Sequence, residues 1–309
     1  MRGIDASRRW YDRTVAPALE REFGELTRRI AVGLAGRGSE CFGFDDEISR
    51  DHDFEVGLTL WLDDDAEREF GFKLERCYAK LHRELAPISQ VQTQSLLGDT
   101  EHGVMTISDF YLRHLGFPGA PQNFRQWLYT PEYAFAEAVN GAVFRDDAGE
   151  FSRIRHTIAT GMPEDVRCKK LAARAALMAQ SGQYNFNRCL RHGERGAAHL
   201  ALAEFVRQAG SMIFLLNRRF APYYKWLFRS MRELPRLAEL SESLEFLLTQ
   251  DAADALLSEV VESVCGAVVS ELKRQGLTDE NADYLEVHAV AITRCIHSRE
   301  IAALHLMEG

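Results

Sequence analysis

Two aspartates, two residues apart, have the type and spacing that most clearly suggest chemistry in this chain. Asp51 and Asp53 open the stretch that runs to Leu62, whose apolar residues are typical of a strand. The alternation of a strand places both carboxylates on one face, close to each other. Two such charges repel, but a divalent cation between them relieves the repulsion, and hard oxygen ligands suit Mg²⁺. The pair therefore predicts a site for Mg²⁺ or Mn²⁺.

A glycine-rich turn precedes the two aspartates. Gly36, Gly38 and Ser39 follow the apolar run 30–36, which is typical of a buried strand. Glycines let the backbone turn sharply, so that N–H groups can point at phosphate oxygens, and the serine hydroxyl adds a donor. The eleven residues 40–50 then lead to Asp51. This order of strand, Gly-Ser turn and carboxylate pair predicts a site for phosphate groups and a divalent metal.

The block resembles the nucleotidyltransferase superfamily that shares the DNA polymerase beta palm. The pattern of that superfamily is a strand, Gly-Ser, a short spacer and Asp-x-Asp, which Gly38-Ser39 and Asp51-His52-Asp53 match. The longer string GxGSExxGFDDxxSxDHD, and the later stretch 182–226, are similar to a poorly characterised bacterial subfamily of unknown function. The resemblance covers most of the chain, and its second part is uninformative about substrate.

The resemblance implies transfer of a nucleoside monophosphate from a nucleoside triphosphate, with ATP expected, to a hydroxyl group, with release of pyrophosphate. Asp51 and Asp53 would be catalytic metal ligands, and Gly38 and Ser39 would hold the beta and gamma phosphates. The third carboxylate of the superfamily is matched less cleanly. Asp109, which follows the apolar run 103–107, is the first choice, and Glu101 and Glu55 compete with it.

The second half of the chain offers further candidates for nucleotide binding. Antibiotic-modifying members of the superfamily place a lysine of their helical domain on the triphosphate, and we expect Lys225 in this role. Asn185 and Arg188 are expected to contact the nucleotide or the acceptor. Tyr224 or Trp226 would stack on a base, although packing in the core is an equally good interpretation of these aromatic residues.

The distribution of apolar residues predicts an α+β protein. Helices are expected at 8–28 and 66–85, strands at 30–36, 54–62, 103–107 and 140–144, and a hairpin turn at 146–149. From about residue 164 onwards helical spacing dominates, with a helix start at Pro222, a C-cap at Gly276, a helix entry at 278–281 and a final helix at 280–306. We therefore expect a small mixed β-sheet nucleotidyltransferase domain at 1–158 and an all-α helical bundle domain at 159–309.

Composition and charge indicate which class of acceptor and which cell compartment to expect. The net charge of −9 and the absence of a basic tail disfavour long nucleic acids, so we expect a small-molecule acceptor. Six scattered cysteines without a CxxC pair indicate neither a zinc ribbon nor a disulfide framework. Without a signal peptide or a membrane-spanning run, a cytoplasmic protein is expected. The alternatives are transfer to a protein or RNA acceptor, and a catalytically impaired regulatory protein that binds nucleotide.

Overall fold

The computed structural model describes residues 2–46, 57–85 and 102–309. The chain divides into two compact units. The first consists of Met1–Pro121 and Ala134–Gly161, and the second of Gln122–Tyr133 and Met162–Gly309. These units describe packing, and the domain boundary expected at residues 158 and 159 stays a prediction.

A four-stranded mixed sheet forms the centre of the first unit, in the order β3-β2-β1-β4. The strands are β1 (Ile30–Leu34), β2 (Thr59–Leu62), β3 (Gly103–Thr106) and β4 (Ala142–Arg145). β1 is antiparallel to β2 and β4, whereas β2 and β3 are parallel. In register, Gly33 lies opposite Thr59, and Thr59 lies opposite Gly103. The end of β1 and the starts of β2 and β3 therefore share one edge, here called the loop edge.

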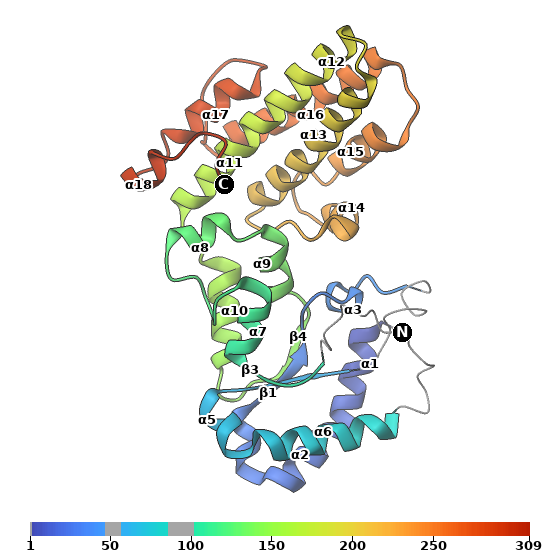
Figure 1. Cartoon of the computed structure of the whole chain (residues 1–309), viewed down its shortest axis with the longest axis vertical. Helices are drawn as coiled ribbons and strands as arrows, with labels where there is room; N and C mark the ends of the chain where they lie inside the picture. Colours follow the sequence, from blue (N-terminus) through green and yellow to red (C-terminus); the bar gives the residue numbers. More distant parts are fainter. Residues whose placement is uncertain (1, 47–56, 86–101) are drawn as a thin grey trace. The chain divides into compact units, whose positions relative to one another are not determined.

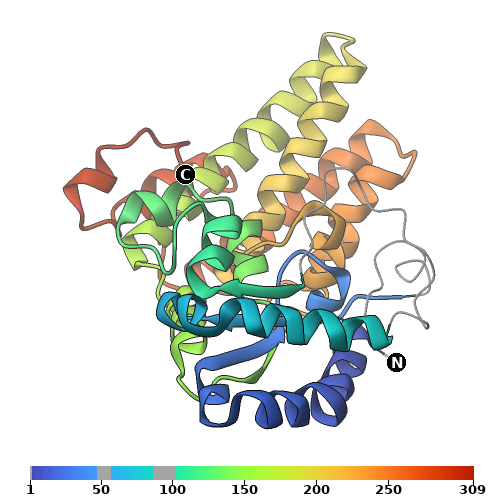
Figure 2. The ribbon, with the colours of Figure 1, turned by 60° about the horizontal axis from the view of Figure 1, so that its bottom comes forward.

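Helices cover both faces of this sheet (Figure 1). On one face, Ile30, Val32, Leu60 and Leu62 pack with apolar residues of the N-terminal helices and of α6 (Phe72–Leu85). Figure 2 shows α6 beside the N-terminal helices on this face. On the other face, Trp61 stacks on Phe151 with ring centroids 3.8 Å apart. The alternation of the strands thus supplies two apolar faces, and the sheet is the middle of three layers.

The helices of the first unit begin before the predicted boundaries in several places. They are α1 (Gly3–Trp10), α2 (Ala16–Phe23), α3 (Ser39–Phe42), α5 (Asp64–Ala66), α6, α7 (Ile107–Leu115) and α10 (Glu150–Thr160), with α9 (Glu132–Val139) entering from the second unit. Tyr11–Val15 and Glu67–Gly71 are π-helical, and Gly24–Arg29 is a 3₁₀ helix.

Every described element that lies wholly in the second unit is helical. The helices are α8 (Phe124–Tyr129), α11 (Glu164–Met178), α12 (Asn187–Arg191), α13 (Arg195–Leu216), α14 (Leu227–Met231), α15 (Leu240–Thr249), α16 (Asp254–Arg274), α17 (Leu285–Thr293) and α18 (Arg299–Ala302). α13 packs against α11, α15 and α16. Gly182 makes one close approach possible, because a Cβ there would lie 2.4 Å from Phe205 Cδ2. The α+β class is confirmed.

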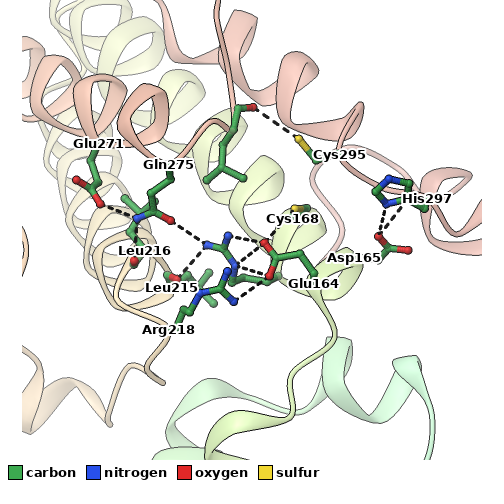
Figure 3. A network of polar contacts seen from close by, with 12 residues as sticks. Glu164, Asp165, Cys168, Leu215, Leu216, Arg218, Glu271, Gln275, Cys295 and His297 are labelled. Atoms are coloured by element: carbon green, nitrogen blue, oxygen red, sulfur yellow. Dashed lines mark hydrogen bonds and ion pairs between the residues drawn. The ribbon is translucent and has the colours of Figure 1, made fainter.

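A polar network joins the ends of three helices in the second unit (Figure 3). Arg167, whose side chain is only 4% exposed, donates to both carboxylate oxygens of Glu164 and to the Leu215 carbonyl at 3.5 Å. Gln275 donates to the Leu216 carbonyl at 2.9 Å. The last carbonyls of a helix have no partner within it; the Leu215 carbonyl also accepts from Arg218 N–H at 3.1 Å, and the two side chains add bonds that tie α13 to α11 and α16.

Four local expectations are corrected by the structure. Asp146 accepts hydrogen bonds from the backbone N–H groups of Gly149 and Ser152, so residues 146–149 lead into α10 and form no hairpin. The helix expected at Pro222 begins with the 3₁₀ helix Tyr224–Trp226. No helix begins at the entry expected at 278–281, although the Thr278 hydroxyl accepts from Glu280 N–H and also pairs with Nδ1 of His288, and α17 begins at Leu285. The single helix expected at 280–306 is interrupted between α17 and α18.

The predicted C-cap at Gly276 is confirmed. Its φ of 68° is left-handed, its N–H donates to the Lys273 carbonyl, and Leu277 N–H donates to the Leu272 carbonyl. This is the Schellman arrangement, which glycine adopts without steric cost. None of the helices in the described ranges is long and apolar enough to cross a membrane.

Candidate functional site

The loop that leaves β1 occupies the loop edge of the sheet. Gly36 follows Ala35 with a φ of 132°, a conformation that favours glycine. Arg37 and Gly38 complete the turn, and α3 begins at Ser39. Because Gly33 pairs with Thr59, this loop, residues 35–39, emerges beside the start of β2. The order that the sequence predicted, a buried strand followed by a Gly-Ser turn, is present.

Asn140 holds the first glycine of the loop by both of its backbone polar groups. Its Oδ1 accepts from Gly36 N–H at 2.9 Å, and its Nδ2 donates to the Gly36 carbonyl at 2.6 Å. Arg155 in turn donates through Nη2 to the carbonyls of Asn140 and Gly141, at 2.9 and 3.0 Å. Gly141 has a φ of 69°, and a Cβ there would lie 1.9 Å from the Leu34 carbonyl oxygen. The segment before β4 is thus fitted closely against the loop.

Ser39 presents hydrogen-bonding groups that the described protein leaves unused. The residue is buried, yet no described residue bonds its hydroxyl or accepts from the N–H groups of Gly38 and Ser39. Three such donors next to one another in a turn are suited to an oxyanion ligand such as a phosphate group.

The side chain of Glu40 packs closely against Gly38, the second glycine of the loop. Its carboxylate folds over Gly38, so that a Cβ on Gly38 would lie 1.9 Å from Glu40 Oε1. The same Oε1 is 4.0 Å from Nε2 of His102, just before β3. Burial lowers the pKa of His102 to about 4, and His82 acts in the same direction. The ring is therefore neutral at pH 7 and packs closely on Gly57, where a Cβ would lie 2.3 Å from its Cδ2.

Arg37 is the cation of the loop itself. Its Nε lies 3.5 Å from Oε2 of Glu137 on α9, and three-fifths of its side chain (60%) is exposed. The carboxylate of Glu137 is buried and also lies 3.5 Å from Nδ1 of His114 on α7. The loop therefore carries a positively charged side chain, and the buried carboxylate of Glu137 orients it.

Asp109 does not lie with these residues. It sits exposed in the first turn of α7, after the end of β3. Because β2 and β3 are parallel, Thr106 lies opposite Leu62, at the edge away from the loop. The neighbouring Ser108 donates to Asp64 Oδ1 at 2.9 Å, beyond the end of β2. Asp109 therefore lies beyond the end of β3 that is away from the loop edge, and its role as the third carboxylate stays a prediction because Asp51 and Asp53 lie outside the described residues.

The other carboxylates of the predicted site, Asp51, Asp53, Glu55 and Glu101, lie outside the described residues. In the described ranges, no group of three or more His, Cys, Asp or Glu residues is arranged to hold a metal ion. The predicted metal site therefore depends on Asp51 and Asp53, and their donor set, two carboxylates, fits a hard divalent cation.

The candidates in the helical unit do not converge on one point. Asn185 lies just before α12, and Arg188 lies on this helix, which leads into the start of α13. Arg188 donates to the Tyr184 hydroxyl at 3.0 Å. Leu227, two residues after Lys225, packs on Gly210 near the other end of α13 (Figure 1). At 1.5 Å of rise per residue the two groups are separated by roughly 20 Å along this helix.

Lys225 and Tyr224 are both on the surface of the helical unit. Lys225 is exposed, and its ammonium lies 5.0 Å from the ring centroid of Trp226. Tyr224 is 73% exposed and packs against Tyr223, with ring centroids 4.2 Å apart. Packing in the core is thus excluded for Tyr224, while its stacking on a base and the binding of phosphate by Lys225 stay predictions.

Sequence reasoning missed Asn140, Arg155, Glu137 and Arg37. Asn140 had a weak signal, because an Asn-Gly pair before a strand is typical of a tight turn, but nothing in the sequence relates it to Gly36. Arg37 lies inside the motif that was singled out, and its charge beside two glycines was the available signal.

Comparisons with known proteins found one family and one solved structure that are similar to this chain. Residues 127–227 match a family described as "Domain of unknown function (DUF4037)". The matched residues include the stretch 182–226. No curated protein matches the chain. A crystal structure of a nucleotidyltransferase-like protein from Exiguobacterium sibiricum 255-15 is similar over 92% of this chain and 81% of that one, at 11% identity and a TM-score of 0.37. At that TM-score the likeness carries no argument about this chain.

Proposed function

We propose that the protein is a metal-dependent nucleotidyltransferase that moves a nucleoside monophosphate, from ATP or another nucleoside triphosphate, to a hydroxyl group of a small molecule. One observation carries the proposal. Ser39 is buried with unused donors at the edge of the sheet where β2 begins, and the sequence ahead of β2 contains Asp51 and Asp53. The proposed phosphate site follows β1 in the chain and the two carboxylates precede β2, the strand that pairs with β1, and this supports the proposal.

The proposed reaction is an in-line displacement at the alpha-phosphorus. The acceptor hydroxyl oxygen forms a bond to phosphorus, the bond from phosphorus to the bridging oxygen of the beta-phosphate breaks, and pyrophosphate leaves. Asp51 and Asp53 would hold Mg²⁺ or Mn²⁺, which when bound neutralises charge on the phosphates. The N–H groups of Gly38 and Ser39 and the Ser39 hydroxyl would orient the beta and gamma phosphates.

The hydroxyl proton needs an acceptor, and the placement of Asp109 argues against that residue. Glu101 lies two residues before Gly103, where β3 begins at the loop edge, and Glu55 lies between Asp53 and β2 in the sequence. We propose that one of these two glutamates is the general base. The direction of β3 is what favours them over Asp109.

Pyrophosphate release tests the reaction. Purified protein would be incubated with Mg²⁺, each nucleoside triphosphate and pools of hydroxylated metabolites, RNA or proteins. We expect release with one class of small molecule, loss of at least a hundredfold for Asp51→Asn or for the essential glutamate, and near wild-type rates for Asp109→Asn. Nucleotide binding without release from any acceptor would overturn the transferase and identify a regulatory nucleotide-binding protein.

A further inference from the structure

The glycines on both sides of Arg37 are held by contacts with other residues, so the Cα atom from which the Arg37 side chain extends is held as well. Gly36 is bonded at its N–H and its carbonyl by Asn140. Gly38 is enclosed by the folded-back carboxylate of Glu40. A long cationic side chain on such a loop loses less conformational entropy on binding than one on a mobile segment.

Glu137 then sets the direction of the guanidinium. Its carboxylate is 9% exposed and contacts Arg37 at Nε, the inner nitrogen, at 3.5 Å. Removing a carboxylate from water is costly unless it is paired, so Arg37 and His114 beside the same oxygen stabilise Glu137 where it is. The contact holds the arginine stem and leaves 60% of the side chain exposed.

The residues next to Arg37 indicate what this cation could bind. The unused N–H groups of Gly38 and Ser39 and the Ser39 hydroxyl follow it directly in the chain. Two buried carboxylates contact the loop, Glu40 at Gly38 and Glu137 at Arg37, and an anion bound there would be repelled by them. A phosphate chain that reaches these donors therefore needs a cation on the loop, and a guanidinium binds phosphate oxygens in a planar, bidentate manner.

We infer that Arg37 is a ligand of the triphosphate chain and that Glu137 is the residue that positions it. The inference rests on the proposed function for the identity of the ligand, and it adds a binding residue that the Gly-Ser and Asp-x-Asp pattern does not contain. Arg37 contacts phosphate oxygens on the same side as the Ser39 donors, and Glu137 acts only through Arg37.

Calorimetric titration with inorganic tripolyphosphate and Mg²⁺, and separately with ATP and Mg²⁺, tests the inference. Arg37→Gln is expected to weaken both affinities about ten- to hundredfold, the value of one or two charge-assisted hydrogen bonds. Arg37→Lys keeps the charge and is expected to recover part of the loss. Arg28→Gln is the matched control, because Arg28 is also exposed and paired with a glutamate at 3.2 Å but precedes the other end of β1. It is expected to change neither affinity.

Glu137 is tested through its dependence on Arg37. Glu137→Gln is expected to weaken tripolyphosphate binding about three- to tenfold when Arg37 is present, and to add nothing when Arg37→Gln is already in place. The double variant also removes the buried carboxylate that Arg37→Gln leaves with His114 alone beside it, so a folded protein remains for the titration if the single variant unfolds. Additive losses from the two changes would overturn the positioning role.

The inference and the proposed function fail in different ways. Nucleotide binding that is lost in Asp51→Asn but unchanged in Arg37→Gln would overturn the inference and leave the function standing. Tripolyphosphate binding that depends on Arg37, without pyrophosphate release from any acceptor, would support the inference and overturn the transferase. Absence of binding of both ligands to the wild-type protein would overturn both.

Discussion

Asn140 hydrogen-bonds both the N–H and the carbonyl of Gly36, a residue 104 positions earlier in the chain. The contact connects the segment before β4 to the loop after β1, and Arg155 supports it from α10. The conformation of the loop therefore depends on residues far from its own sequence.

Replacing Asn140 tests whether this contact shapes the loop. Asn140→Ala leaves two buried backbone groups of Gly36 unpaired, so we expect the free energy of unfolding of the first unit to fall by about 2–3 kcal/mol. Hydrogen exchange of the Gly36 amide, followed by NMR, should accelerate in the variant. Asn281→Ala, at an exposed asparagine, is the control and should cost under about 0.5 kcal/mol. Unchanged protection of the Gly36 amide would show that Asn140 does not hold the loop.

Arg167 and Arg218 both pair with Glu164, and they differ in exposure. Arg167 is 4% exposed and also caps α13, whereas Arg218 is 63% exposed. We expect Arg167→Met to lower the free energy of unfolding by about 2–3 kcal/mol, because the Leu215 carbonyl and the carboxylate lose a partner. Arg218→Met should cost less than about 1 kcal/mol. Urea unfolding compares them, and equal effects would contradict the capping role of Arg167.

Lys170 is buried in α11, and its ammonium has no hydrogen-bond acceptor among the described residues. Burial lowers the pKa of Lys170 to about 8, although Glu132 acts in the opposite direction. The unfolded chain, with a pKa near 10.5, binds more protons between pH 8 and pH 10.5. This residue therefore makes the protein more stable as pH rises through that window, by about 3 kcal/mol in all.

Lys170→Met is expected to abolish this dependence. The free energy of unfolding of the variant should exceed that of the wild type by the largest amount at pH 7. Most of this difference should be gone by pH 10. Lys225→Met, at an exposed lysine, should change the free energy of unfolding by under about 0.5 kcal/mol at each pH. If the difference in free energy of unfolding between Lys170→Met and the wild type stays constant from pH 7 to pH 10, the buried charge of Lys170 does not destabilise the folded protein.

The sequence predicts the elements of this fold better than their relationships. The apolar run at β1, the strand at β3 and the Gly276 cap follow from local patterns, and the structure has all three. The direction of β3 beside β2 is not local, and it decides that Asp109 lies at the far edge. The pairing of the Thr278 hydroxyl with His288 on α17 is likewise not readable from the local pattern at 278–281.

The same distinction applies to the candidate site. Gly38 and Ser39 were predictable because the motif that contains them is contiguous. Asn140, Arg155 and Glu137 were not, because each acts on the loop only after the chain has brought distant segments together. In the helical unit, Lys225 was expected to bind phosphate and Arg188 the nucleotide or the acceptor, and the sequence could not show that the length of α13 separates the two.

Binding of metal and nucleotide by the pair Asp51 and Asp53 is the central claim, and a thermal-shift titration with Mg²⁺ and ATP tests it most directly. At nucleotide concentrations a hundredfold above the dissociation constant, the wild-type protein should gain about 2.7 kcal/mol, or roughly 5 °C in unfolding temperature. The shift should require Mg²⁺ and should be absent in the double variant Asp51→Asn, Asp53→Asn. A shift of the same size in that variant would contradict the account.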